Sequence, residues 1–211
     1  MPALRPAHTP LIGHFIHLVP LTRAHLPALH AAIGQPRVFA GGFGGGPAGY
    51  RAELPAFLDW AGGYFAWTQG NVYAVQLAGG AHDGRLVGTT TLSDFVPVCE
   101  SAHIGWTAYD PRVWGTAVNA EAKRLLLGLA FDHGFGRIKI QADALNERSR
   151  AAIAGIGATF EGIARRDLPR ADGSWRDSAI YSIIVDDWPR VRARLDERLA
   201  RYAGRPVEFR A

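Results

Sequence analysis

The sequence is poor in cysteine, because Cys99 is the only one among its 211 residues. An intramolecular disulfide is therefore excluded, and the composition suits a reducing compartment, for which we take the cytoplasm as the default. The N-terminus lacks a charged segment leading into a long apolar run, so we expect no signal peptide. No stretch approaches the roughly 18 apolar residues of a membrane span, so we expect no membrane partner.

Charged residues are also scarce, at 20% of the chain, whereas 48% of the residues are hydrophobic and six are tryptophan. This composition argues against disorder and allows a substantial core to be buried. The length suits one domain over residues 1–211. Within it we expect a core over about residues 11–187 and a C-terminal amphipathic helix over about residues 188–203.

The net charge is +4 and the sequence pI is about 9.6, which favours anionic ligands. Nucleic acid and a phosphorylated cofactor both satisfy that bias. The arginines are scattered, however, and no run of five or six basic residues occurs. Nucleic-acid-binding modules usually cluster their positive charge, so we expect no nucleic-acid partner.

The hydrophobic pattern predicts a mixed sheet with helices and shows no internal repeat. Strands are predicted at residues 14–19, 71–78, 85–93, 102–109, 137–144, 160–168 and 178–185. The last of these is apolar on both faces, which predicts a position deep in the sheet. Helices are predicted after Thr22, near Leu54, near Val118, over residues 147–156 and around Val191.

Two of these segments carry more specific predictions. Residues 41–47 are too rich in glycine for regular structure, and we expect them to be mobile. In the helix over residues 147–156, which Asn146 can cap, we expect Ala152, Ile153 and Ile156 to face inward.

The segment from Asp110 to Ala117 joins a predicted strand to a predicted helix. A loop at a helix start presents free backbone N–H groups and the positive end of the helix dipole, which together suit an anion. Gly115 and Ala117 keep the main chain accessible to a pyrophosphate, and Arg112 adds a fixed charge. A small-residue connection with a good cap is the alternative. No Gly-Lys-Ser/Thr phosphate loop and no Gly-x-Gly-x-x-Gly after a strand are present.

The order of several motifs resembles that of the GNAT acetyltransferases. Arg112-Val113-Trp114-Gly115-Thr116-Ala117 resembles their Gln/Arg-x-x-Gly-x-Gly/Ala loop, and Ile104-Gly105-Trp106 resembles the strand before it. Asn146-Glu147-Arg148-Ser149 with Gly157-Ala158 is similar to the Asn-x-x-Ser and Gly-Phe segment of the subgroup that acetylates ribosomal-protein N-termini. The likeness spans roughly Leu11 to Arg201.

This resemblance implies an α/β fold with a mixed, mostly antiparallel sheet, flanked by helices and with splayed central strands. Acetyl-coenzyme A would lie in the gap, with its acetyl group moving directly to a primary amine of a protein N-terminus or a small molecule. Main-chain groups near Thr107 and Ala108 would bind the pantetheine and thioester. The resemblance places Asn146 at the cofactor too. The pyrophosphate would bind the N–H groups of Val113, Trp114, Gly115, Thr116, Ala117 and Val118, which run from the loop into the helix.

Acylation of an amine requires removal of a proton, so the site needs a base. His103 is the first candidate, because it precedes the cofactor strand motif and titrates near neutrality. Glu100, acting through a water, is the second. The alternatives are a structural histidine and a solvated loop carboxylate. Asp94 and Asp143 are weaker candidates, and Asp143 equally suits a loop contact or a pair with an arginine.

Departure of the thiolate calls for a proton or hydrogen-bond donor. Ile153 occupies the position at which many GNAT enzymes have a tyrosine acid. Ser149 matches the serine of the ribosomal-protein subgroup, although a serine in a first helical turn is often only a capping residue.

The acceptor side is less clearly predicted. Five aromatic residues either line a pocket or pack two short helices, namely Phe39, Phe43, Tyr64, Phe65 and Trp67. No metal-ligand spacing occurs, and Cys99 has no histidine–acid companion motif. The rival interpretations are a non-catalytic module that binds acyl-coenzyme A and a basic nucleic-acid-binding domain. Relatives are often dimers, so a homodimer is compatible with the resemblance.

Overall fold

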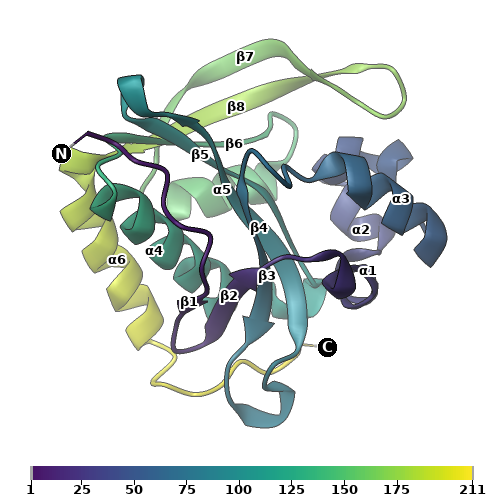
Figure 1. Cartoon of the computed structure of the whole chain (residues 1–211), viewed down its shortest axis with the longest axis horizontal. Coiled ribbons are helices and arrows are strands. Elements are labelled where there is room, and N and C mark those ends of the chain that lie inside the picture. Colours follow the sequence, from purple (N-terminus) through teal and green to yellow (C-terminus); the bar gives the residue numbers. More distant parts are fainter. Residues whose placement is uncertain (1, 211) are drawn as a thin grey trace.

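A computed structural model describes residues 2–210, in which a continuous sheet separates two groups of helices (Figure 1). The strand order is β1-β2-β3-β4-β5-β6-β8-β7, and every neighbouring pair is antiparallel except β5 and β6. The predicted fold class is thus confirmed. The strands are β1 (Leu11–Ile12), β2 (Ile16–Pro20), β3 (Asn71–Leu77), β4 (Leu86–Val96), β5 (Ser101–Tyr109), β6 (Arg137–Asp143), β7 (Thr159–Pro169) and β8 (Trp175–Ile184).

Helices cover both faces of the sheet because its strands are apolar on both sides around the centre. One core includes residues of α4, α5 and α6, and the second lies beneath α1, α2 and α3 on the opposite face. The helices are α1 (Leu26–Ile33), α2 (Pro36–Phe39), α3 (Leu54–Tyr64), α4 (Ala117–Asp132), α5 (Glu147–Gly155) and α6 (Trp188–Ala200). Among residues 2–210, no helix is both long and apolar enough to cross a membrane.

The two central strands separate part of the way along their length. The parallel register joins Ser101 to Arg137 and ends where Ile104 faces Ile140. Beyond that point β5 continues to Tyr109 beside β4 alone, and β6 continues beside β8 alone. The predicted splay of the central strands is therefore present.

A β-bulge lies on β5 where the strands separate. Thr91 and Thr89 of β4 face Gly105 and Ala108, so two steps on one strand match three on the other. Trp106 lies in this bulge and adopts a left-handed backbone conformation, with a φ of +47°. Such a conformation is unfavourable for a bulky residue by about 1–3 kcal/mol, and it persists only where surrounding contacts fix it. The indole Nε1 donates to the Tyr64 carbonyl at 3.0 Å, which supplies one such contact.

Helix α4 is fixed to the sheet by a buried carboxylate. Glu121 is 6% exposed, and its oxygens accept from the backbone N–H groups of His14, Phe15 and Ile16 at 2.7–2.8 Å. These bonds hold the turn between β1 and β2. The sequence pattern predicted one strand over residues 14–19, but this turn interrupts it, so β2 begins only at Ile16.

Three further predictions needed correction. The glycine-rich segment was expected to lack regular structure, but it forms short 3-10 turns at Phe43–Gly45 and Pro47–Gly49, and the left-handed Gly42 and Gly44 are buried. Ala152 is exposed, because α5 presents only Ile153 and the following Ile156 to the core.

The third correction concerns the C-terminus. The helix predicted over about residues 188–203 ends at Ala200. The chain then runs back toward the start of α4, and Val207 of this last segment is buried in the core. The last apolar strand is β8, which is largely buried and lies one strand from the edge of the sheet.

Replacing Glu121 tests how far this buried carboxylate stabilises the fold. Glu121→Ala leaves three backbone N–H groups without an acceptor, so we expect the free energy of unfolding to fall by about 3–5 kcal/mol in urea denaturation. Glu197→Ala is the matched control, because Glu197 is 72% exposed and bonds only Arg201. The control should change stability by less than about 0.5 kcal/mol. Similar losses in the two variants would contradict this account.

Candidate active site

The loop between β5 and α4 is organised by its own hydrogen bonds. The N–H groups of Val113, Trp114 and Thr116 donate to carbonyls within the turn, and the Thr116 hydroxyl caps the Val118 N–H at 3.4 Å. The N–H groups of Gly115 and Ala117 have no acceptor within residues 2–210. Of the predicted set of donors, these two at the helix start are therefore free for an anion.

Gly115 occupies a position that only glycine fits comfortably. Its φ is +71°, and a Cβ built there would lie 2.9 Å from the Arg210 guanidinium. The Gly115 carbonyl accepts from Arg210 at 3.0 Å and from the Tyr202 hydroxyl at 3.2 Å. Arg210 thus adds a positive charge beside the loop, a contribution that the sequence pattern did not reveal.

Arg112 is paired with a neighbouring carboxylate. Its guanidinium forms an ion pair with Asp110 at 2.6 Å and lies 4.1 Å from the centre of the Phe209 ring. Hydrogen bonding to Asp110 is the main reason why the pKa of Arg112 is raised. The charge of Arg112 therefore serves first to fix the turn.

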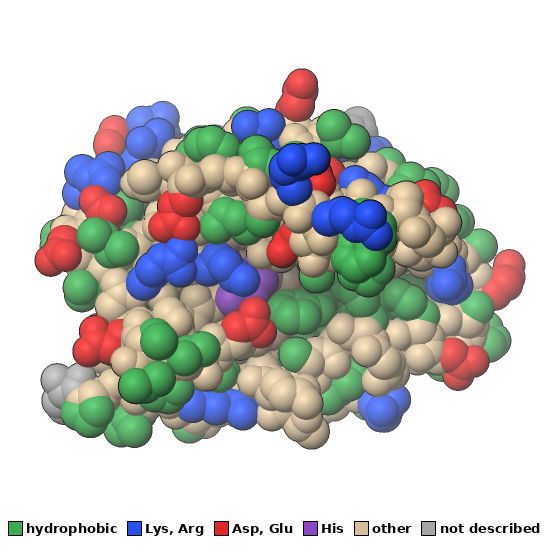
Figure 2. All heavy atoms as spheres, turned by 90° about the horizontal axis from the view of Figure 1, so that it is seen from above, with side chains coloured by type: hydrophobic (Ala, Val, Ile, Leu, Met, Phe, Trp, Pro, Cys, Tyr) green, Lys and Arg blue, Asp and Glu red, His purple; other side chains and the backbone are tan. Residues whose placement is uncertain are grey.

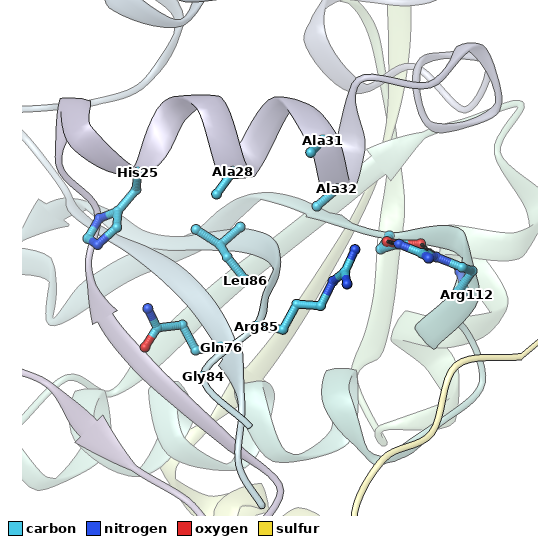
Figure 3. A pocket seen from close by; sticks show the side chains of 10 residues that line it. His25, Ala28, Ala31, Ala32, Gln76, Gly84, Arg85, Leu86 and Arg112 are labelled. Atoms are coloured by element: carbon cyan, nitrogen blue, oxygen red, sulfur yellow. Dashed lines mark hydrogen bonds and ion pairs between the residues drawn. The ribbon is translucent and has the colours of Figure 1, made fainter. Parts of the chain in front are cut away.

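A cavity of about 410 Å³ adjoins this ion pair between α1 and the β3–β4 hairpin (Figure 3). Figure 3 shows the Arg85 side chain extending toward Arg112 across it, beneath the alanines of α1. The cavity lies at the loop end of β5, and neither His103 nor Thr107 lines it.

Trp114 carries an arginine over its ring from each of two helices. The guanidinium of Arg148 lies 3.4 Å and that of Arg37 lies 4.9 Å from the ring centre. Burial, and secondly the charge of Arg37, lower the pKa of Arg148. Arg37, Arg148 and Asn146 line a second cavity, of about 460 Å³. Figure 2 shows one face of the molecule, on which basic and acidic side chains alternate around a hollow.

His103 and Asp94 form a dyad on the strands that lead to the bulge. The His103 ring is 5% exposed, and its Nδ1 lies 3.0 Å from the Asp94 carboxylate. Burial lowers the pKa of His103, and the hydrogen bond to Asp94 opposes that shift. The neutral ring with its proton on Nδ1 donates to Asp94, which leaves Nε2 as a basic nitrogen.

The surroundings of His103 suit a polar ligand. Its Nε2 is buried and has no hydrogen-bond partner within residues 2–210. The hydroxyl oxygens of Thr91 and Ser93 are also buried and also lack a partner within these residues. Ser93 faces His103 and Thr91 faces Gly105 in the β4–β5 register, so the three groups share one face. Buried polar atoms are normally paired, so this row marks room for water or substrate atoms.

Lys123 lies on the other face of β5. It is 4% exposed, and its ammonium donates to the Thr107 hydroxyl at 3.0 Å. The Thr107 oxygen is also 2.8 Å from the Thr90 hydroxyl. Burial lowers the pKa of Lys123 to about 7. Sequence inspection missed this residue, because a lysine in an amphipathic helix is ordinarily read as solvent-exposed.

The contacts of the remaining predicted site residues are those of a turn and of a helix cap. Glu100 is exposed in the turn before β5, with its carboxylate near Gly136, three residues from His103 on an extended strand. Asn146 accepts from the Ser149 N–H at 3.0 Å and donates to the Gly41 carbonyl at 2.6 Å. It therefore caps α5 and anchors the glycine-rich segment. The Ser149 side chain is half-buried in the first turn of that helix.

Asp143 and the five aromatic residues predicted near the acceptor amine have structural contacts. Asp143 is buried and pairs with Arg170 at 2.6 Å, as the interpretation of an arginine pair expected, and it also accepts from the Leu145 N–H of its loop at 3.0 Å. The aromatic residues largely pack against one another, with Phe39 and Phe65 buried and Phe43 in edge contact with Tyr64. Residues 2–210 contain no group of three or more His, Cys, Asp or Glu side chains that could hold a metal ion.

Comparison with known proteins matches residues 16–159 to a family model described as an acetyltransferase (GNAT) domain. YdaF of Bacillus subtilis strain 168, whose name describes a candidate ribosomal N-acetyltransferase, is 34% identical over 113 residues. These residues are 53% of this chain and 60% of the relative, so the match spans less than two thirds of the length of YdaF.

Solved structures extend the comparison over most of the chain. A candidate acetyltransferase from T. thermophilus is 30% identical and has a TM-score of 0.80, covering 90% of this chain and 97% of that chain. RimJ of Mycobacterium smegmatis, solved with CoA-disulfide, is 21% identical and has a TM-score of 0.69, covering 87% and 88% of the two chains. At that identity the likeness concerns the fold alone.

The buried ammonium predicts how stability depends on pH. The pKa of Lys123 is about 7 in the folded chain, whereas the ordinary value for a lysine is 10.5, so between these values only the unfolded chain binds the proton. The free energy of unfolding should therefore rise with pH, by up to about 1.4 kcal/mol per pH unit. Lys123→Met should remove this rise and be the more stable protein at about pH 7.5.

Urea denaturation across this pH window measures the slope. Lys139→Met is the control, because it removes a partly exposed ammonium from the neighbouring strand and should keep the wild-type slope. If Lys123→Met kept that slope too, the assignment of the buried charge would be wrong.

Proposed function

Because the chain belongs to the acetyltransferase (GNAT) family, we propose that it moves the acetyl group of acetyl-coenzyme A directly to a primary amine. The observation that carries the proposal is the dyad of His103 and Asp94 beside the opened strands. A peptide or protein N-terminal α-amine is the favoured acceptor, and a small-molecule amine is the alternative. The name of YdaF, the 34% identical relative, supports the first.

The surroundings of the strand gap fit acetyl-coenzyme A, which supplies the acetyl group as a thioester. Beyond Ile104, β5 has no partner strand on the side of β6 among the described residues, so main-chain groups near Thr107 and Ala108 can bind an extended ligand. Gly115 and Ala117 offer free N–H groups to a pyrophosphate at the start of α4. Arg210 places a positive charge beside them.

His103 is the base in this proposal. The acceptor must be a neutral amine, and the Nε2 of His103 is a buried nitrogen with a free lone pair. The Asp94 carboxylate holds the ring through Nδ1 and favours the imidazolium that forms when Nε2 takes the proton. Glu100 is less suited, since its carboxylate lies in an exposed turn near Gly136.

In this proposal the transfer is a single displacement. The amine nitrogen forms a bond to the acetyl carbon, the carbon–sulfur bond breaks, and the sulfur leaves with the bonding electron pair. The proton of the amine passes to Nε2 of His103. The Ser149 hydroxyl is the proposed hydrogen-bond donor to the sulfur, since Ile153 is buried where a tyrosine acid would stand. Cys99 lies exposed in a separate turn and takes no part.

Binding of acetyl-coenzyme A is tested by calorimetry. We expect the wild type to bind and Gly115→Glu to lose at least tenfold in affinity, because a side chain enters the loop and a carboxylate opposes the pyrophosphate. Gly173→Glu is the matched control, since Gly173 also has a positive φ, of 83°, but lies in the β7–β8 turn with nothing nearby. An equal loss in both variants, or no binding by the wild type, would overturn the proposed cofactor site.

Catalysis is tested by release of free coenzyme A with peptides that have free α-amino groups, the same peptides N-acetylated, and small amines. We expect His103→Gln to lower kcat/KM by about 10²–10⁴-fold while cofactor affinity changes little. His133→Gln removes an imidazole at the end of α4 and should be neutral. No release with any amine would favour the non-catalytic binding module instead.

The pH profile separates a base from a structural histidine. The pKa of His103 is lowered by burial and raised by Asp94, so the acid limb of kcat/KM should lie below pH 6.5. Asp94→Asn removes the raising contribution and should move that limb to lower pH. A limb that stays in place in this variant would exclude His103 as the titrating base.

A further inference from the structure

Lys123 is a buried amine without a carboxylate partner among residues 2–210. The side chain is 4% exposed, and no Asp or Glu within residues 2–210 forms an ion pair with it. Other buried charges are compensated, since Glu121 accepts three backbone N–H groups and Asp143 pairs with Arg170. An uncompensated buried ammonium costs several kcal/mol, so a purely apolar residue would stabilise this position better.

The ammonium is held at the point where the central strands separate. Lys123 donates to the Thr107 hydroxyl at 3.0 Å, and Thr107 belongs to the β5 bulge. The Thr107 hydroxyl also has the Gly105 carbonyl at 3.3 Å and the Thr90 hydroxyl at 2.8 Å as partners. Thr107 therefore does not need Lys123 to satisfy its hydrogen bonding, so packing alone does not explain the lysine.

The two titratable side chains at the gap lie on opposite faces of β5. Ile104 packs with α4, so the alternation of the strand puts His103 on the other face, and the bulge returns Thr107 to the face of Lys123. An acetyl thioester bound in the gap would have a proton acceptor on one side and a positive charge on the other. Deprotonation of the amine requires the proton acceptor, and departure of the sulfur as an anion is favoured by the positive charge.

We propose that Lys123 is a further catalytic residue whose ammonium, held by Thr107, stabilises the negative charge on the coenzyme A sulfur as the carbon–sulfur bond breaks. The inference rests on the proposed function and assigns a residue that the family motifs do not include. The sulfur takes the bonding electron pair, Lys123 keeps its proton, and the proton of the amine goes to His103. Ser149 remains the hydrogen-bond donor from the side of α5.

The charge state of Lys123 is consistent with this role. Burial lowers its pKa to about 7, and a nearby anion would favour the protonated form. His103, with Asp94 on its Nδ1, lies across the strand, and Lys139 of β6 acts on that histidine. Glu121 on the same helix is occupied by the backbone of the β1–β2 turn. Among residues 2–210, no Asp or Glu forms an ion pair with Lys123.

The ionisation of the coenzyme A thiol in the binary complex tests the proposal without an acceptor amine. Cys99→Ser removes the only protein thiol, so no protein thiolate then contributes to the ultraviolet absorbance of the coenzyme A thiolate. In this background we compare Lys123 with Lys123→Met, which removes charge and hydrogen bond, and with Lys123→Gln, which keeps a donor to Thr107. Calorimetry with coenzyme A confirms that each complex forms.

We expect the bound thiol to ionise at lower pH than free coenzyme A when Lys123 is present. Both replacements should raise its pKa by about one unit, a tenfold loss of thiolate at a given pH. If the bound thiol had the same pKa in Lys123→Gln as in the parent, only the hydrogen bond would matter, and the proposal would be overturned. The same pKa in the parent and both variants would overturn it as well. Failure of the parent to bind coenzyme A would instead overturn the proposed function itself.

Discussion

The early end of the hydrogen bonding between β5 and β6 is the constraint on which the rest of the site depends. Pairing stops where Ile104 faces Ile140, although both strands continue. Main-chain groups beyond that point need other partners, because buried backbone N–H and carbonyl groups are rarely left unpaired. The gap therefore favours an extended polar ligand, and the start of α4 lies at its open end with two free N–H groups.

The bulge at Trp106 converts this gap into a site with two chemically different sides. A regular strand would place residues 103, 105 and 107 on one face. The extra residue instead turns Thr107 toward α4 and Lys123, while His103 remains on the face of α1–α3. The strained φ of Trp106 is stabilised by its indole bond to Tyr64. The strained bulge on β5 thus places His103, the proposed base, and Lys123, the proposed positive charge, on opposite faces of the strand.

Much of the fold was predictable, because local patterns encode it. The strand and the helix from Ala102 onward have periodic apolar residues, and both elements appear in the structure. Contacts between distant residues were not predictable from such patterns. The pair of Lys123 and Thr107 depends on the bulge. Arg210 reaches Gly115 across 95 positions only because the chain turns back after α6.

Amide hydrogen exchange with and without acetyl-coenzyme A tests most directly whether the opened strands bind the cofactor. The account predicts that ligand slows exchange in two stretches, the β5 segment around Trp106 and Ala108 and the loop from Gly115 into α4. Protection confined to the cavity lined by Arg85 and His25, or no protection at all, would contradict the account.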